Sequence, residues 1–222
     1  MTVIVIDSDP GSDGDLIAAT VATQLGLNLV DEACLFERLK CRGVELPATH
    51  PGRDREEVAA HGVYPWRALG TKLHLELLRL AQQDQILLHW PCASYLLADV
   101  GHIPRIKVRA PLSMRVRRYA ARCGCDEREA RSRIQQHEGN TRFIFSACFG
   151  VQAPLDAECY SLVADTGWLA SADWADEIIE MAGDAEFAPT VASQAMLRWQ
   201  LLQLPQEPDA AIPCDCDSSR SC

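Results

Sequence analysis

The chain has 222 residues, 48% of them hydrophobic and 23% charged, which is the composition of a globular protein with one well-packed domain. Its formal net charge of −10 argues against nonspecific binding to nucleic acid. No stretch approaches the ~18 uninterrupted apolar residues of a membrane span. Because no signal peptide precedes the first strand, we expect a cytoplasmic protein with no membrane partner.

The first predicted elements are a strand, a glycine-containing loop and a helix, within "VIVIDSDPGSDGDLIAATVATQLGL" at residues 3–27. This order is typical of phosphate-binding proteins, in which backbone N–H groups and a helix N-terminus hold the phosphate. Where such a loop usually supplies a cation, this chain has Asp15, with Asp13 shortly before it. A loop that merely turns the chain, with Gly11 and Gly14 serving backbone geometry, is the simpler interpretation of this stretch.

Four aspartates in and before this loop allow a second interpretation, in which their oxygens hold a hard cation. They are Asp7, Asp9, Asp13 and Asp15. We favour solvated side chains over a metal site, because loop aspartates are mostly exposed to water.

Further strands and helices alternate along the chain. The strands are predicted at 27–31, 85–90, 105–110 and 160–165. The helices are predicted at 15–25, 32–40, 66–83, 92–99, 112–122, 126–138 and 172–182. Alternation of this kind favours a parallel sheet covered by helices on both faces.

The predicted core domain spans residues 1–183 and contains a polar, mobile insertion at 42–64, which has two prolines. A C-terminal helix follows within 184–204. Its expected apolar stripe consists of Val191, Met196, Leu197 and Leu201. Residues 205–222 lack periodicity and contain cysteines and acids, so we expect a flexible tail.

One segment of this acidic chain is basic. Residues 105–142 hold eleven of the 21 Lys and Arg residues against four acids, a local excess of seven positive charges. Such a segment suits a small anionic ligand better than a long polyanion. The helical arginines within it are Arg115, Arg117, Arg118 and Arg122. They form either a phosphate clamp or a solvated helix face stabilised by Glu127 and Glu129.

The ten cysteines are scattered, which argues against a disulfide scaffold. Three thiols in the tail, Cys214, Cys216 and Cys222, lack a clear fourth ligand for a structural zinc site. A soft metal or a redox pair is compatible with the Cys-x-Cys spacing. We favour incidental thiols and therefore do not expect a metal on the tail.

The ordered motifs resemble the cytidylate-kinase-like family of P-loop nucleoside monophosphate kinases over about residues 3–182. The loop "GSDGD" at 11–15 stands where the family has Gly-Ser-Gly-Gly-Arg. "APLSMRVRR" at 110–118 resembles a strand end and its following helix, and "CDEREARSRIQQHEGNTRFIF" at 125–145 resembles the family's lid. "YSLVADT" at 160–166 is similar to its last strand, and Asp31 stands where the family has an acid.

This resemblance implies an α/β fold, namely a three-layer P-loop NTPase-like domain with a parallel sheet flanked by helices, a helical lid at 112–149 and a disordered C-terminal tail. It also implies ATP and Mg²⁺ as cofactors if the chain is a kinase. A retained nucleotide or phosphate site would use the loop and the basic segment. Its residues would be Gly11, Ser12, Gly14, Arg115, Arg118, Arg131, Arg133 and Arg142.

The departures from the family fall on residues that do chemistry. Asp15 replaces the loop cation, and a carboxylate near phosphate is repulsive by about 1 kcal/mol in water. Where the family has the Gly-Arg that holds the acceptor phosphate, this chain has "HWPC" at 89–92, and Thr141 stands in place of a lid arginine. Neither His89 nor His137 has a partner visible in the sequence, so no catalytic residue is assigned.

We therefore expect a degenerate member of the family that acts mainly by binding a protein partner or a small anionic ligand, with weak or no phosphoryl transfer. One alternative is an active ATP-dependent kinase of a nucleoside monophosphate such as CMP, or of another small substrate. A second alternative is an accessory protein in metal or cofactor handling.

Overall fold

The computed structural model describes residues 2–44, 64–152 and 156–205. Within them, five strands form one parallel sheet in the order β2-β3-β1-β4-β5. The strands are β1 (Val3–Ser8), β2 (Asn28–Asp31), β3 (Ile86–His89), β4 (Arg105–Arg109) and β5 (Leu162–Asp165). The predicted parallel sheet is therefore confirmed.

Helices connect the strands, as predicted. They are α1 (Gly14–Leu25), α2 (Glu32–Cys41), α4 (Tyr64–Gln83), α5 (Pro91–Leu96), α6 (Leu112–Cys123), α7 (Glu127–Ile144), α8 (Ser171–Ala182) and α9 (Val191–Gln203). Short helical turns are η1 (Phe145–Phe149), η2 (Ala157–Cys159) and η3 (Ala185–Phe187). The largest difference from prediction concerns α7, which continues past residue 138 and passes into the π-helical turn η1.

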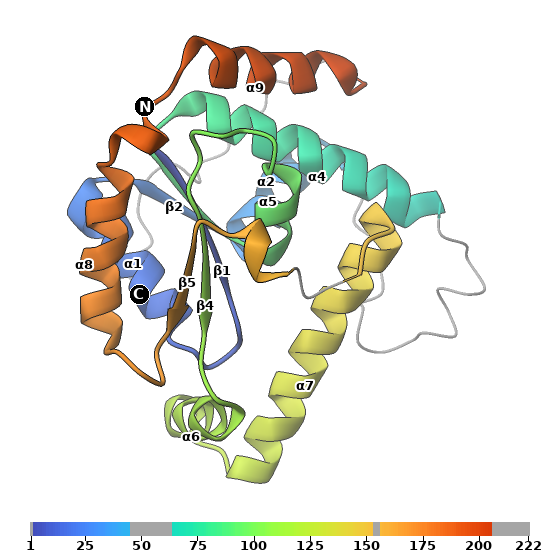
Figure 1. The fold of residues 1–222 in the computed structure, drawn as a ribbon. Coiled ribbons are helices and arrows are strands. Elements are labelled where there is room, and N and C mark those ends of the chain that lie inside the picture. Colours follow the sequence, from blue (N-terminus) through green and yellow to red (C-terminus); the bar gives the residue numbers. More distant parts are fainter. Residues whose placement is uncertain (1, 45–63, 153–155, 206–222) are drawn as a thin grey trace.

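Alternating apolar residues divide the sheet into two packed faces (Figure 1). Ile4 and Ile6 of β1 point to the face that α1 and α8 cover. Val3 and Val5 point to the opposite face, where α2, α4, α5 and η1 pack. A parallel sheet buried on both sides produces such apolar strands. The result is the expected three-layer domain.

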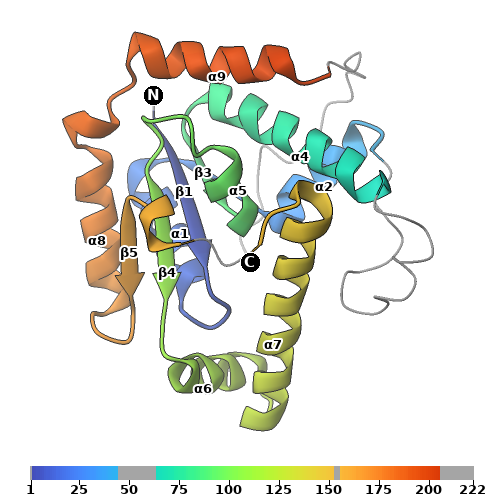
Figure 2. The same cartoon turned by 45° about the vertical axis from the view of Figure 1, so that its right-hand side comes forward.

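The C-terminal helix α9 lies against α4 (Figure 2). Leu197 joins the core, and the Gln200 side chain donates a hydrogen bond to Asp99 at 3.3 Å. Two members of the predicted apolar stripe do not belong to the buried face, because Val191 is 87% exposed and Met196 38% exposed. None of the described helices is long and apolar enough to cross a membrane.

Helices α6 and α7 form a hairpin beyond the carboxyl ends of the strands (Figure 2). Gly124 makes the turn with a positive φ of 64°, and the Asp126 side chain caps α7 by accepting from the Glu129 backbone N–H at 2.8 Å. A small apolar cluster joins the two helices and consists of Val116, Ala120, Ala130 and Ile134. This hairpin is the expected helical lid.

Candidate functional site

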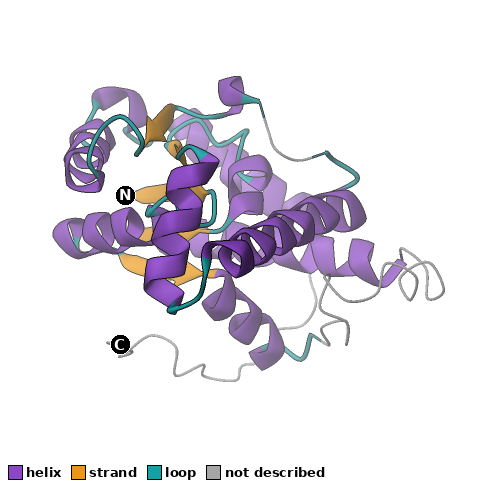
Figure 3. Cartoon of the chain, turned by 90° about the horizontal axis from the view of Figure 1, so that it is seen from below, coloured by secondary structure: helices purple, strands orange, loops and turns teal. Residues whose placement is uncertain are grey.

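The candidate site lies where the parallel strands end (Figure 3). In open α/β sheets, ligands bind in the crevice outside the carboxyl ends of the strands. β1 ends there at Ser8, and a short loop leads into α1 at Gly14. The strand, loop and helix predicted from the sequence are therefore present at this edge.

The loop backbone has a tight path that explains its glycines. Gly11 has a φ of 79°, and a Cβ there would lie 2.5 Å from the backbone oxygen of Arg115. A Cβ on Gly14 would lie 2.1 Å from the Cβ of Ser8. Asp13 also has a positive φ, of 64°, in the left-handed region that aspartate tolerates better than most residues. Both glycines therefore allow close approaches that a side chain would block.

Two arginines of α6 neutralise the acids of the loop. The Arg118 Nε lies 3.0 Å from Asp13 Oδ2, and the Arg122 Nη2 lies 2.8 Å from Asp13 Oδ1. Arg122 also pairs with Asp15. The sequence did not reveal these pairs, because the partners come from a helix more than 100 residues away.

Arg118 also connects α6 to the end of β5 through hydrogen bonds. Its guanidinium donates to the Thr166 hydroxyl at 2.7 Å and to the Thr166 backbone oxygen at 3.0 Å. The Thr166 hydroxyl donates in turn to the backbone oxygen of Ser12 at 2.8 Å. The predicted phosphate-binding residues Ser12 and Arg118 are thus joined in one network with the loop.

Arg115 is a buried residue of α6 that connects the hairpin to the loop and to the end of β4. Its side chain is 10% exposed, donates to the backbone oxygens of Ala110 and Pro10 at 3.1 and 3.4 Å, and pairs with Glu138 of α7 at 2.8 Å. This buried guanidinium holds the loop, the end of β4 and both lid helices together.

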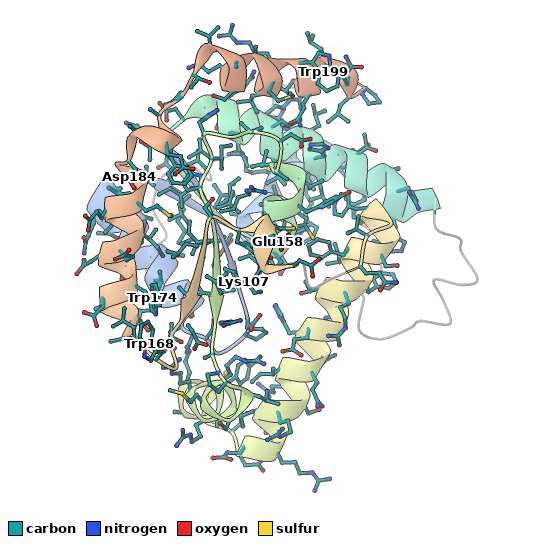
Figure 4. All side chains as sticks on the ribbon, in the orientation of Figure 1. Lys107, Glu158, Trp168, Trp174, Asp184 and Trp199 are labelled. Carbon is teal, nitrogen blue, oxygen red and sulfur yellow. The ribbon has the colours of Figure 1, made fainter. Side chains whose placement is uncertain are left out.

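A cavity of about 220 Å³ lies beside the loop, between the ends of β1 and β4 and the inner side of α7. Its charged and titratable lining comprises Asp7, Asp9, Lys107, His137, Glu138 and Arg142. Figure 4 marks Lys107 on β4, on the side of the sheet that faces α7. Arg142 and Thr141 line this cavity, together with Ser8, Asp9 and Pro10 from the first half of the loop.

Lys107 forms the floor of the cavity with two carboxylates. Its Nζ lies 3.1 Å from Asp7 Oδ1 and 2.8 Å from Asp9 Oδ1, and the Tyr160 hydroxyl donates to the other oxygen of Asp7. Burial alone would lower the pKa of Lys107, but the two carboxylates raise it above its ordinary value. Burial and the Asp7 charge both raise the pKa of Tyr160, so the phenol stays protonated.

His89 has a partner that the sequence did not reveal. Its Nε2 lies 2.8 Å from the hydroxyl oxygen of Ser8, across the ends of β3 and β1. Burial lowers the pKa of His89, although Asp15, Asp31 and Asp7 oppose that effect. The imidazole is therefore neutral at physiological pH, and the pair joins two central strands.

The remaining predicted arginines lie apart from the cavity lining. Arg131 is exposed on α7, and Arg133 is exposed and pairs with Glu129 at 2.6 Å. The predicted set therefore divides into three groups: the loop with Arg115 and Arg118, the cavity with Arg142, and the exposed surface of α7 with Arg131 and Arg133.

No metal site forms in the described part of the chain, where no three metal-ligating side chains gather. The four loop aspartates face different cations, since Asp7 and Asp9 pair with Lys107 whereas Asp13 and Asp15 pair with arginines. These pairings give the hard-cation interpretation no support among the described residues. The tail thiols Cys214, Cys216 and Cys222 lie outside the described residues.

Comparison with solved structures shows the same fold elsewhere. An uncharacterised protein from Eubacterium ventriosum superposes with a TM-score of 0.64 at 18% identity, covering 82% of this chain and 97% of that one.

Sequence comparison is more specific. A cytidylate kinase from Sulfolobus acidocaldarius is 26% identical over 179 residues, which cover 79% of this chain and 91% of that protein. A cytidylate kinase from Methanopyrus kandleri is 29% identical over 176 residues, covering 74% of this chain and 84% of that protein. The model of the cytidylate kinase-like family matches residues 3–167, as the ordered motifs predicted. The chain therefore belongs to the cytidylate kinase-like family.

Proposed function

We propose that this chain binds a small anionic ligand in the cavity beside the loop and transfers phosphoryl groups from ATP weakly or not at all. The observation that supports this most is the pairing of Asp13 and Asp15 with Arg118 and Arg122 at the loop.

The charge balance at the loop is unfavourable for a triphosphate. The N-terminus of α1 offers roughly half a positive charge to an incoming phosphate. Asp13 and Asp15 place two negative charges there, and Arg118 and Arg122 are already bound to them. A phosphate must therefore compete with the carboxylates for the same guanidinium groups. Each carboxylate left about 4 Å from the phosphate repels it by about 1 kcal/mol in water, and by several times more in a dry site.

The cavity offers an anion a better position. Arg142 lines it from α7 and forms no ion pair with any residue of the described ranges. A guanidinium in this state can donate two parallel hydrogen bonds to a phosphate or carboxylate. Lys107 contributes a second cation, although Asp7 and Asp9 share it.

An active kinase that uses ATP and Mg²⁺ is the second candidate. Arg118 and Arg122 favour it, because they bring to the loop the positive charge that the loop sequence lacks. If both guanidinium groups exchanged carboxylates for phosphates, the loop would hold a triphosphate by the arginines of α6. Cytidylate kinase is the name of both relatives above, so CMP is the acceptor to test first.

The two candidates differ in ADP production. We expect ADP formation from ATP, Mg²⁺ and CMP to stay at the rate without protein, and equally so with other nucleoside monophosphates. Turnover near the ~1–100 s⁻¹ of ordinary kinases would overturn the proposal and establish the second candidate.

A further inference from the structure

Each wall of the cavity carries one charged group whose hydrogen-bonding capacity is not fully used by the described residues. Asp9 Oδ1 lies 2.8 Å from Lys107, but its other oxygen accepts no hydrogen bond from the residues that the structure describes. On the opposite wall, the Arg142 guanidinium forms no ion pair with the same residues. The two groups have opposite charges and line one cavity, yet they lie more than the 4.0 Å of an ion pair apart.

The other charges of the cavity are already balanced in pairs. Lys107 contacts Asp7 and Asp9, and Arg115 reaches Glu138 at 2.8 Å. The lining itself carries three carboxylates, Asp7, Asp9 and Glu138, and two cations, Lys107 and Arg142, because Arg115 lies outside it. The excess negative charge lies at the end of β1, where Asp7 and Asp9 share Lys107.

We propose that this cavity binds a small phosphate monoester that carries an ammonium group, with the ammonium at Asp9 and the phosphate at Arg142. The inference rests on the proposed function, since it requires an anion in the cavity, and it adds the second charge that the ligand must carry.

Charge balance favours such a ligand over a simple anion. A phosphate without an amine would occupy Arg142 but leave the free oxygen of Asp9 unpaired, and it would add negative charge beside three carboxylates. A ligand that carries both an ammonium and a phosphate can pair with Asp9 on one wall and with Arg142 on the other. Hydrogen bonds between charged groups are roughly twice as strong as neutral ones, so the amine adds to affinity as well as to selectivity.

The size of the cavity fits a small ligand. Its volume of about 220 Å³ is below the ~300–1,000 Å³ of pockets for drug-sized molecules. A two- or three-carbon chain between the charged groups is therefore the expected class.

Calorimetric titration of the full chain with three probes tests the inference. The probes are 2-aminoethyl phosphate, ethyl phosphate and 2-aminoethanol. We expect 2-aminoethyl phosphate to bind at least tenfold more tightly than ethyl phosphate, and 2-aminoethanol to bind more weakly than either.

Two variants test which residue binds the ammonium and which binds the phosphate. Asp9→Asn should remove the preference for the amine and strengthen ethyl phosphate binding, because Lys107 then shares its charge with Asp7 alone. Arg142→Gln should weaken both phosphates at least tenfold. Arg142 is exposed and the Asp9 side chain is 29% exposed, so both variants should fold, and Asp176→Asn is the matched surface control.

Equal affinity of the wild-type chain for ethyl phosphate and 2-aminoethyl phosphate would overturn this inference and leave the proposed function standing. An unchanged preference in Asp9→Asn would also overturn it. If neither phosphate binds, the proposed anion site fails and this inference fails with it.

Discussion

The first half of the loop after β1 lines the cavity and its second half meets α6, and the charged groups of these two regions are paired differently. In the second half and at the start of α1, Asp13 and Asp15 each contact an arginine of α6. In the cavity, Asp9 keeps one oxygen unpaired and Arg142 forms no ion pair with the described residues. Both regions share the segment from Asp7 to Asp15, so nine residues of sequence supply all of their acids except Glu138 of α7.

The two regions therefore differ in whether a cation is left without an anionic partner. The loop has glycines that allow its tight backbone path, and the cations beside it already have anionic partners. The cavity has no such internal partner for Arg142. Whether an anion can bind therefore depends less on the fold than on which cations remain unpaired.

Removing Arg115 should damage both regions, because it supports each of them. Arg115→Ala leaves Glu138 and two backbone oxygens without their donor. Since Glu138 is 30% exposed, we expect a loss of about 2–3 kcal/mol in unfolding free energy, somewhat below that of a fully buried pair. Chemical denaturation measures it, with the exposed Arg117→Ala as control, expected within about 0.5 kcal/mol. Equal effects of the two variants would show that Arg115 is not an anchor.

Gly14→Ala should distort the loop at the junction of β1 and α1. The new Cβ would lie 2.1 Å from the Cβ of Ser8, so the end of β1 or the start of α1 must shift, at a cost of about 1–3 kcal/mol. Gly139→Ala in α7 meets no atom within 4 Å and should stabilise the helix by about 0.5–1 kcal/mol. Thermal unfolding of both variants gives the comparison. A Gly14→Ala protein as stable as wild type would mean that the loop is looser than described.

Lowering the pH should reduce the unfolding free energy through His89, which links β3 to β1 by its contact with Ser8. Because burial lowers the folded-state pKa of His89 below 6.5, the unfolded chain binds a proton first as the pH falls through 6.5. The unfolding free energy should then decrease, by at most about 1.4 kcal/mol per pH unit for one group, and should not change on this account above pH 7.

Urea denaturation between pH 5 and 8 tests this with His89→Gln, which should show a shallower slope. His74 and His102, whose pKa values burial also lowers, should supply the slope that remains. Identical slopes for wild type and variant would contradict the assignment to His89.

The pair between Asp15 and Arg122 should contribute little to stability. Its side chains are 57% and 46% exposed, so Asp15→Asn should change the unfolding free energy by less than about 1 kcal/mol. The effect should shrink further in 1 M salt, where screening acts over about 3 Å. A salt-insensitive loss above about 2 kcal/mol would mean that the pair is buried in solution, for instance beneath a partner.

Most of the fold was predictable because it depends on local periodicity. The continuous apolar run at Val3–Ile6 and the alternation of strands with helices predicted the sheet and its layers. The end of α7 was misplaced, because the polar pattern near residue 138 hides the continuation into the buried Phe145. In α9, the sequence did not reveal that Gln200 and not Val191 faces the core, since that choice depends on Asp99 across the interface.

The candidate site was less predictable because its contacts join distant segments. Asp13 and Asp15 were recognised as a departure from the family, but their partners Arg118 and Arg122 are brought to them only by the turn between β4 and α6. The same holds for Ser8 and His89, which are 81 residues apart. Sequence spacing cannot report such pairs.

Titration of ATP with Mg²⁺ into the wild-type chain and into Asp13→Gly/Asp15→Arg tests the central claim most directly. The double variant restores the family's loop sequence, and glycine suits the positive φ of residue 13. We expect wild-type binding to be weaker than about 1 mM, the upper end of usual KM values, and the variant to bind at least tenfold tighter, a gain of about 1.4 kcal/mol. Micromolar ATP binding by the wild-type chain would contradict the account, because Arg118 and Arg122 would then be available to phosphate after all.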